Sequence, residues 1–182
     1  MKGMMLLANY FEDIEGLGTL DLVRRAKIVV DTVSIAGKKE ITTQSNVVML
    51  AEKLIEEINL DEYDFLIIPG GQAVMKTHLY SELTHTIVNH FAKKHALIAT
   101  ICAAPSIVGK LGYLENKDFV CYPSFEKLVE NGNYLPDKKV IVSDNFITSK
   151  AAGTTFDFAY EIIKYLKSET IAKHIIDSVF YN

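Results

Sequence analysis

Short runs of apolar residues alternate along the chain with longer segments in which apolar residues recur every three or four positions. A short continuous apolar run is typical of a strand buried on both faces, and the longer spacing is typical of an amphipathic helix. The predicted strands span residues 4–8, 28–35, 65–68, 97–100, 140–143 and 146–148, with a possible small hairpin at 42–50. The predicted helices span residues 14–26, 81–94 and 105–111, a segment that begins at Thr154 or Thr155, and 169–181.

This alternation predicts the α/β fold class, because right-handed βαβ crossovers produce a mostly parallel sheet with helices on both faces. No repeat or linker divides the chain, so we expect residues 1–182 to form a single domain with a flavodoxin-like three-layer sandwich. Ligands of such sheets bind beyond the carboxyl ends of the strands, where the strand order switches direction. Three segments should meet there: the loop that holds Glu15, the Gly70–Gly71 turn, and residues 101–103.

Composition and charge indicate where the protein is located and which classes of partner it can bind. The chain of 182 residues has a net charge of −4, which argues against nucleic acid or an anionic membrane as a partner, since both require a basic surface. The first apolar run ends at Asn9, too early for a signal peptide, and no run approaches the roughly 20 residues that cross a bilayer. We therefore expect a cytoplasmic protein whose two cysteines, Cys102 and Cys121, are reduced.

Cys102 is the candidate nucleophile. Small residues follow it in a strand-to-helix turn, which would lift the sulfur to the sheet edge and direct the next N–H groups at it, as in a nucleophile elbow. A thiol pKa lowered by about three units requires roughly 4 kcal/mol, whereas a helix N-terminus supplies about 1 kcal/mol or less. A second group must therefore stabilise the thiolate if its pKa is to fall that far. The turn alone leaves open the ordinary role of a free cysteine, that of a small buried hydrophobe.

Glu15 is the candidate partner of this thiol. An ionised carboxylate beside the sulfur would raise the thiol pKa, but a protonated Glu15 would donate a hydrogen bond to the thiolate. The two groups would then share one negative charge and provide a general acid and base. Glu12 and Asp13 fit the solvated acids that helix starts favour, and the same interpretation is open for Glu15. The residues alone do not select Glu15 from the three.

The Gly70–Gly71 pair follows a buried strand, and glycines let a ligand approach the backbone. The Gly71 and Ala103 amides are the candidate oxyanion hole, although a simple tight turn is a strong alternative. The later glycines of a dinucleotide site or P-loop are missing. No metal site is predicted, because the histidines lack ligand spacing and are expected at the surface; they are His78, His85, His90, His95 and His174. Cys121 is expected to be a packed strand residue.

Several segments in register resemble the ThiJ/PfpI superfamily, and within it the branch of the parkinsonism-associated protein deglycase and its bacterial relatives. The resemblance covers almost the whole chain. The matching segments are Glu12–Glu15, Asp21–Ala26, Ile68–Gly71, Ile101–Pro105 and Gly153–Ala159. It implies a flavodoxin-like homodimer in which Cys102 is the easily oxidised nucleophile and Glu15 its protonated partner.

The resemblance also implies an activity. We expect a cofactor-independent glyoxalase or deglycase that acts on 2-oxoaldehydes such as methylglyoxal or on their adducts. Cys102 would form a hemithioacetal, Glu15 would move the proton, and Gly70, Tyr122, Asp21 and Lys150 are possible pocket residues. The alternative is a redox sensor or chaperone in which Cys102 oxidises to a sulfinate without turnover.

The chain departs from the family pattern at the site. Ala103 follows the cysteine where the protease-like branch has His, which disfavours a Cys–His peptidase. Tyr122 replaces a His of the parkinsonism-associated protein, Ser45 and Lys150 replace arginines, and residues 151–153 replace Gly-Pro-Gly. These changes bear on substrate preference.

Overall fold

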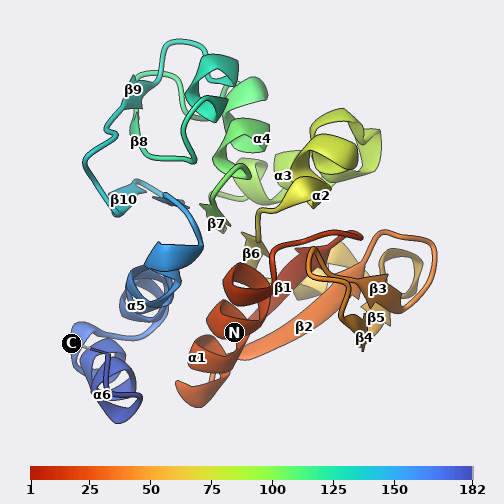
Figure 1. Ribbon diagram of the computed structural model, residues 1–182, viewed down its shortest axis with the longest axis horizontal. Coiled ribbons are helices and arrows are strands. Elements are labelled where there is room, and N and C mark those ends of the chain that lie inside the picture. Colours follow the sequence, from red (N-terminus) through yellow and green to blue (C-terminus); the bar gives the residue numbers. More distant parts are fainter. Residues whose placement is uncertain (182) are drawn as a thin grey trace.

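A computed structural model describes residues 1–181, and a seven-stranded sheet runs through its centre in the order β10-β11-β7-β6-β1-β2-β5 (Figure 1). Every pair of neighbours in this sheet is parallel except β10 and β11, which are antiparallel. The strands are β1 (Lys2–Leu7), β2 (Val29–Ser34), β5 (Lys53–Leu54), β6 (Phe65–Ile68), β7 (Leu97–Ile101), β10 (Val140–Ser143) and β11 (Phe146–Ser149). The predicted α/β class with a mostly parallel sheet is confirmed.

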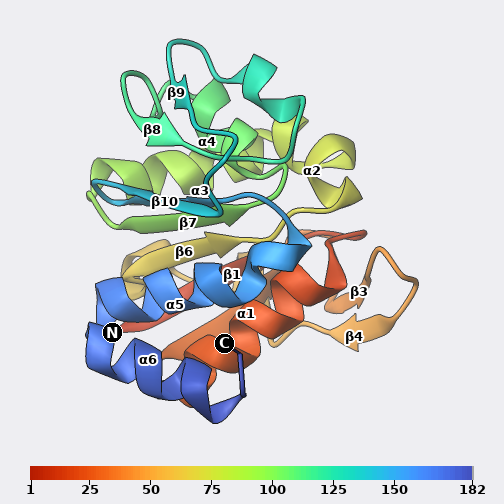
Figure 2. The same cartoon turned by 60° about the vertical axis from the view of Figure 1, so that its left-hand side comes forward.

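Helices cover both faces of the sheet, as Figures 1 and 2 show. One face carries α1 (Thr19–Arg25), α5 (Thr155–Leu166) and α6 (Glu169–Ser178), and the other carries α3 (Glu82–Lys93) and α4 (Pro105–Lys110). Successive residues of β1 point to opposite faces, so Met5 and Leu7 belong to the core under α1 and α5, whereas Met4 and Leu6 belong to the core under α3 and α4. This two-sided burial explains the continuous apolar runs.

Smaller elements lie outside the central sheet. The hairpin predicted at 42–50 is present as β3 (Glu40–Thr42) and β4 (Val48–Leu50). A second two-stranded sheet joins β8 (Asp118–Phe119) to β9 (Asn133–Tyr134), and a short helix, α2 (Gln72–Lys76), follows the glycine turn. The remaining short turns are η2 (Ile55–Glu57), η3 (Leu60–Glu62), η4 (His78–Tyr80), η5 (Phe125–Leu128) and η6 (Ala152–Thr154).

Three expectations from the sequence need correction. The helix predicted at 14–26 begins with a π-helical turn, η1 (Ile14–Gly18), before α1 starts at Thr19. Cys121 is buried but lies just after β8 rather than in a strand. His78, expected at the surface, is fully buried, and its Nδ1 lies 3.1 Å from Thr84 Oγ1. Burial without a charged partner lowers the pKa of His78 to about 4, so it is a neutral core residue.

The sheet order brings the carboxyl ends of β1, β6 and β7 side by side. The first strand lies next to β6, which in turn lies next to β7, as the flavodoxin-like order predicts. The loops that follow these three strands carry Glu15, Gly70–Gly71 and Cys102. Among residues 1–181, no helix is both long and apolar enough to cross a bilayer.

Candidate active site

Cys102 occupies a strained position directly after β7. Its φ of 64° lies in the left-handed region, which a residue with a Cβ seldom adopts. Two backbone hydrogen bonds hold it there: its N–H donates to the Ser149 carbonyl at 2.9 Å, and its own carbonyl accepts from the Tyr122 N–H at 2.7 Å. Strain that the surroundings maintain in this way is common where a side chain must be aimed at a ligand. The backbone therefore turns sharply at Cys102.

The two glycines after β6 are each required for a different reason. Gly71 has a φ of 86°, and a Cβ there would lie 2.5 Å from Glu12 N. A Cβ on Gly70 would lie 2.6 Å from Cys102 Cβ and 2.6 Å from Glu15 Oε2. Because both of those atoms approach the same point, Cys102 and Glu15 face each other across Gly70. The absence of a side chain at Gly70 leaves room for the pair.

The π-helical turn buries Glu15, whose side chain is only 1% exposed. The Gly70 N–H donates to Glu15 Oε2 at 2.9 Å, and the Glu15 N–H donates to Glu12 Oε2 at 2.8 Å. Glu15 Oε1 is buried and has no hydrogen-bond partner among residues 1–181. An unpartnered buried carboxyl oxygen favours the protonated form, because a proton removes the charge that burial penalises.

Burial sets the protonation of Glu15. It raises the pKa of this carboxyl to about 7, although contact with the Cys102 thiol and the Gly70 N–H acts in the opposite direction. The carboxyl is therefore half protonated near neutral pH, where an ordinary glutamate would be ionised. Glu15 can accordingly both donate and accept a proton under physiological conditions.

The pKa of the Cys102 thiol is raised, first by burial and then by the charge of ionised Glu15. The backbone N–H groups of Gly71 and Ala103 act in the opposite direction, because they stabilise the thiolate. The sequence predicted a lowered thiol pKa, and that prediction is wrong, because burial outweighs the stabilisation by the two N–H groups. Two acids in one buried site resist ionising together, and the pair therefore carries at most one negative charge near neutral pH.

The pair lies in the wall of a cavity of about 500 Å³, a volume suited to a small molecule. The cavity is lined by residues from six loops and helix starts, and most of its wall is apolar. The lining residues are Glu12, Glu15, Gln44, Gly71, Gln72, Met75, Lys76, Cys102, Ala103, Tyr122, Phe125, Ala151 and Ala152. Within residues 1–181, no group of three or more His, Cys, Asp or Glu side chains is arranged to hold a metal ion.

The structure brings together five of the residues singled out from the sequence: Cys102, Glu15, Gly71, Ala103 and Tyr122 all line this cavity. Gly70 adjoins it through the hydrogen bond to Glu15.

The prediction that Asp21 and Lys150 are pocket residues is wrong, because neither lines the cavity. Asp21 pairs with Arg25 on the exposed surface of α1, with Nε–Oδ2 at 2.8 Å. Lys150 Nζ donates to the Pro136 carbonyl at 2.8 Å. Ser45, which replaces a family arginine, donates to Asp13 and does not line the cavity.

Sequence reasoning missed several lining residues because tertiary contacts alone bring them in. Gln44 belongs to the β3–β4 hairpin, where its Oε1 accepts from the Gln72 N–H at 2.8 Å. Lys76 ends α2, and its Nζ lies 3.9 Å from the centre of the Tyr10 ring. Glu12 was assigned to a solvated helix start but lines the cavity. One signal could have found Glu12, since it belongs to the same acidic cluster as Glu15.

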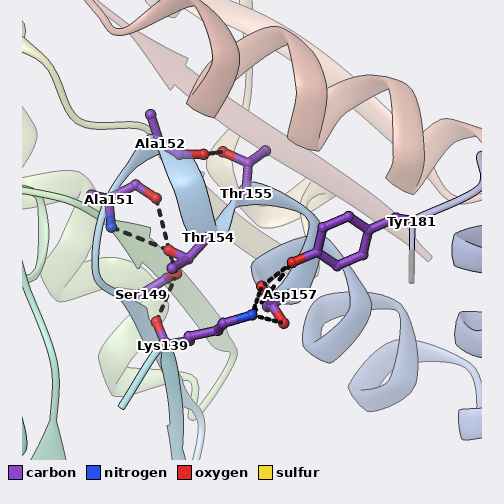
Figure 3. A network of polar contacts seen from close by, with 8 residues as sticks. All are labelled: Lys139, Ser149, Ala151, Ala152, Thr154, Thr155, Asp157 and Tyr181. Atoms are coloured by element: carbon purple, nitrogen blue, oxygen red, sulfur yellow. Dashed lines mark hydrogen bonds and ion pairs between the residues drawn. The ribbon is translucent and has the colours of Figure 1, made fainter. Parts of the chain in front are cut away.

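A buried polar network supports the wall formed by Ala151 and Ala152 (Figure 3). Thr154 Oγ1 contacts both the N–H and the carbonyl of Ala151 and lies 2.7 Å from Ser149 Oγ. The Ser149 carbonyl also accepts a hydrogen bond from the Cys102 N–H, so Ser149 connects this wall of the cavity to the turn that holds Cys102. Farther out, Asp157 accepts from Tyr181 Oη at 2.8 Å and pairs with Lys139, which ties the C-terminal segment to α5.

The fold and this cavity define a class: flavodoxin-like proteins that carry a cysteine on a strained strand-to-helix turn beside a buried acid. Comparison with known proteins identifies the family. The chain belongs to the DJ-1/PfpI family, whose sequence model matches residues 1–165. This finding confirms the resemblance drawn from the sequence motifs.

Relatives cover almost the whole chain. Protein dj-1beta of Drosophila melanogaster is 31% identical over 186 residues, covering 100% of this chain and 98% of the relative. Its crystal structure superposes with a TM-score of 0.93 at 27% identity, covering 100% of this chain and 98% of the other. A protein named glutathione-independent glyoxalase DJ-1, from Schizosaccharomyces pombe, is 29% identical, with 93% of each chain covered. A protein named deglycase, from Pyrococcus abyssi, is 28% identical, covering 92% of this chain and 100% of the relative.

Proposed function

We propose that this protein is a cofactor-independent glyoxalase or deglycase that acts on 2-oxoaldehydes such as methylglyoxal, or on their adducts. One observation carries the proposal: Cys102 and Glu15 face each other across Gly70 in the wall of a cavity of small-molecule size. The names of the yeast and archaeal relatives, glyoxalase and deglycase, support the same class of substrate.

The first step joins the substrate to sulfur. The Cys102 thiolate attacks the aldehyde carbon, the carbonyl π bond breaks, and the oxygen takes the proton of Glu15. The product is a hemithioacetal and an ionised Glu15. The Gly71 and Ala103 N–H groups, which stabilise negative charge at this turn, would bind the developing oxyanion.

The second step isomerises the adduct. Ionised Glu15 removes the proton from the carbon that bears sulfur, which gives an enediolate. The hydroxyl proton on that carbon then passes to the neighbouring oxygen, and Glu15 returns its proton to the neighbouring carbon. The resulting thioester is hydrolysed to a 2-hydroxy acid, which frees the thiolate. A carboxyl whose pKa lies at about 7 is suited to both halves of this transfer. The proton transfers at carbon use Glu15 and the hydrolysis uses water, so no cofactor enters the proposal.

The test is an assay of methylglyoxal consumption without glutathione, with lactate as the measured product. Wild type is expected to be active. Cys102→Ser is expected to lose activity completely, and Glu15→Gln to lose at least about 100-fold, the typical contribution of a general acid and base. Cys121→Ser, which removes the other thiol, is the matched control and should retain activity. Activity that persists in Cys102→Ser would remove Cys102 as the nucleophile.

A second candidate function is redox sensing through oxidation of Cys102 to a sulfinate. It is favoured by the partial exposure of Cys102 at the cavity and by the two N–H groups that stabilise an anion there. Selective oxidation of Cys102 by mild peroxide, in a protein with negligible methylglyoxal turnover, would support this function over the enzymatic one.

A further inference from the structure

The only two cysteines of the chain lie on backbone segments that are hydrogen-bonded to each other. The Tyr122 N–H donates to the Cys102 carbonyl at 2.7 Å, and Cys121 immediately precedes Tyr122. With standard peptide dimensions, this bond keeps the two Cα atoms within about 7.5 Å of each other. Disulfides span Cα separations of roughly 4.4–6.8 Å. The hydrogen bond therefore holds the two segments close enough for a Cys102–Cys121 bond with little backbone movement.

The two thiols differ in access. Cys121 is 0% exposed and belongs to the apolar core under α3 and α4, and the side chain of Cys102 packs against that same core. Cys102 also lines the cavity, where small oxidants can reach it. Cys121 has no exposed surface through which an external oxidant could reach it, and burial, followed by the charge of Glu126, raises its pKa to about 12. Oxidation must therefore begin at Cys102.

Glu126 is the candidate proton acceptor for the buried thiol. The charge of Glu126 acts on Cys121, and Glu126 Oε2 is buried without a hydrogen-bond partner among residues 1–181. A carboxylate oxygen in that condition can take the thiol proton when Cys121 attacks an electrophile. The site described above uses neither Cys121 nor Glu126.

We propose that Cys121 is a resolving cysteine that traps oxidised Cys102 as an intramolecular disulfide when the protein meets hydrogen peroxide. The Cys102 thiolate attacks one peroxide oxygen, the O–O bond breaks, and the leaving hydroxide takes the Glu15 proton to become water. Cys102 is then a sulfenic acid. The inference goes beyond the proposed aldehyde chemistry and shares only the reactivity of Cys102 with it.

The second step consumes the sulfenic acid. The side chain of Cys102 turns from Glu15 towards Cys121, which passes its proton to Glu126 and attacks the Cys102 sulfur. The S–O bond breaks, and the hydroxide leaves as water after receiving that proton. In total, one peroxide is reduced to two waters while two thiols become one disulfide. The disulfide removes the nucleophile from the cavity, and a thiol reductant restores it, in contrast to a sulfinate.

The test is mass spectrometry of the intact protein and of its non-reduced peptides after treatment with stoichiometric hydrogen peroxide. Wild type is expected to lose two hydrogens and yield one cross-linked peptide pair containing both cysteines, within a single chain. Cys121→Ser is expected instead to gain two oxygens at Cys102, and Cys121→Ala serves as a second variant if the serine is poorly tolerated in the core. Glu126→Gln should slow disulfide formation without slowing the loss of the free Cys102 thiol.

Three results would overturn the inference. The first is a sulfinate at Cys102 that forms at the same rate in wild type and in the Cys121 variants. The second is a disulfide found only between separate chains, and the third is no oxidation of Cys102 at all. Because the readout is mass and not turnover, it is independent of the methylglyoxal assay, and either proposal can fail alone.

Discussion

At the scale of single residues, the site depends on a carboxyl that is buried where an ionised one would be unfavourable. Glu15 is held by the Gly70 N–H on one oxygen and has no hydrogen-bond partner among residues 1–181 on the other. Its raised pKa is the physical link between the packing of the π-helical turn and the chemistry of Cys102. The same shift makes the stability of the fold depend on pH.

The sign of this dependence follows from the raised pKa. Folded Glu15 holds its proton up to pH 7, whereas the unfolded carboxyl loses it near 4.5. Its contribution to stability is therefore fully present below pH 4.5 and is lost as pH rises through 7, by roughly 3 kcal/mol. Glu15→Gln should remove that loss and be the more stable protein at pH 7.5. Urea unfolding of both proteins at pH 4.5, 6 and 7.5 measures this difference in the free energy of unfolding, with the variant Glu130→Gln at an exposed position as control. Parallel pH curves for wild type and Glu15→Gln would contradict the burial argument.

At the scale of elements, most strands could be predicted because burial on both faces leaves continuous apolar runs such as residues 65–68. The π-helical turn could not, since its apolar spacing over five residues is indistinguishable from the start of an α-helix. The choice of Glu15 among three neighbouring acids depends on that turn, which rotates Glu15 into the core and leaves Glu12 at the cavity rim. Gln44 and Lys76 enter the site through contacts between segments distant in sequence, which no local pattern encodes.

The loop after β11 gives a second prediction at this scale. Thr154→Val deletes the hydroxyl that joins Ser149 to Ala151, so the wall of the cavity and a neighbour of the Cys102 turn lose their support. The expected loss of stability is about 1–3 kcal/mol, the penalty for buried polar groups left unpaired. We also expect the KM for methylglyoxal to rise more than kcat falls, because the wall shapes binding more than chemistry. Thr154→Ser keeps the hydroxyl and should restore both values. Equal KM values in Thr154→Val and wild type would contradict this role.

At the scale of the whole molecule, the sheet order explains why residues from three distant segments meet: β1, β6 and β7 end at one edge. That convergence could be predicted from the alternation of strands and helices. The two residues that the cavity excludes, Asp21 and Lys150, show the limit of transferring positions by motif. Each lies next to a motif but takes a partner on the surface, Arg25 for one and the Pro136 carbonyl for the other.

The homodimer that the family resemblance implies is a prediction at this scale. Three apolar side chains of the β3–β4 hairpin are more than half exposed, at 52% for Val47, 60% for Val48 and 72% for Leu50, which is unfavourable in an isolated chain. Light scattering after size-exclusion chromatography should give twice the mass of the chain at micromolar concentration. The mass of a single chain under those conditions would contradict the prediction.

The central claim is that Cys102 and Glu15 form a coupled pair of acids, in which ionised Glu15 raises the pKa of the Cys102 thiol. The most direct measurement is the thiolate absorbance of the Cys121→Ser protein as a function of pH, because Cys102 is then the only thiol. The account predicts a thiolate midpoint above about 8.5, because burial and the charge of ionised Glu15 raise the thiol pKa, and a lower midpoint in the additional variant Glu15→Gln, which removes that charge. Equal midpoints with and without Glu15 would contradict it.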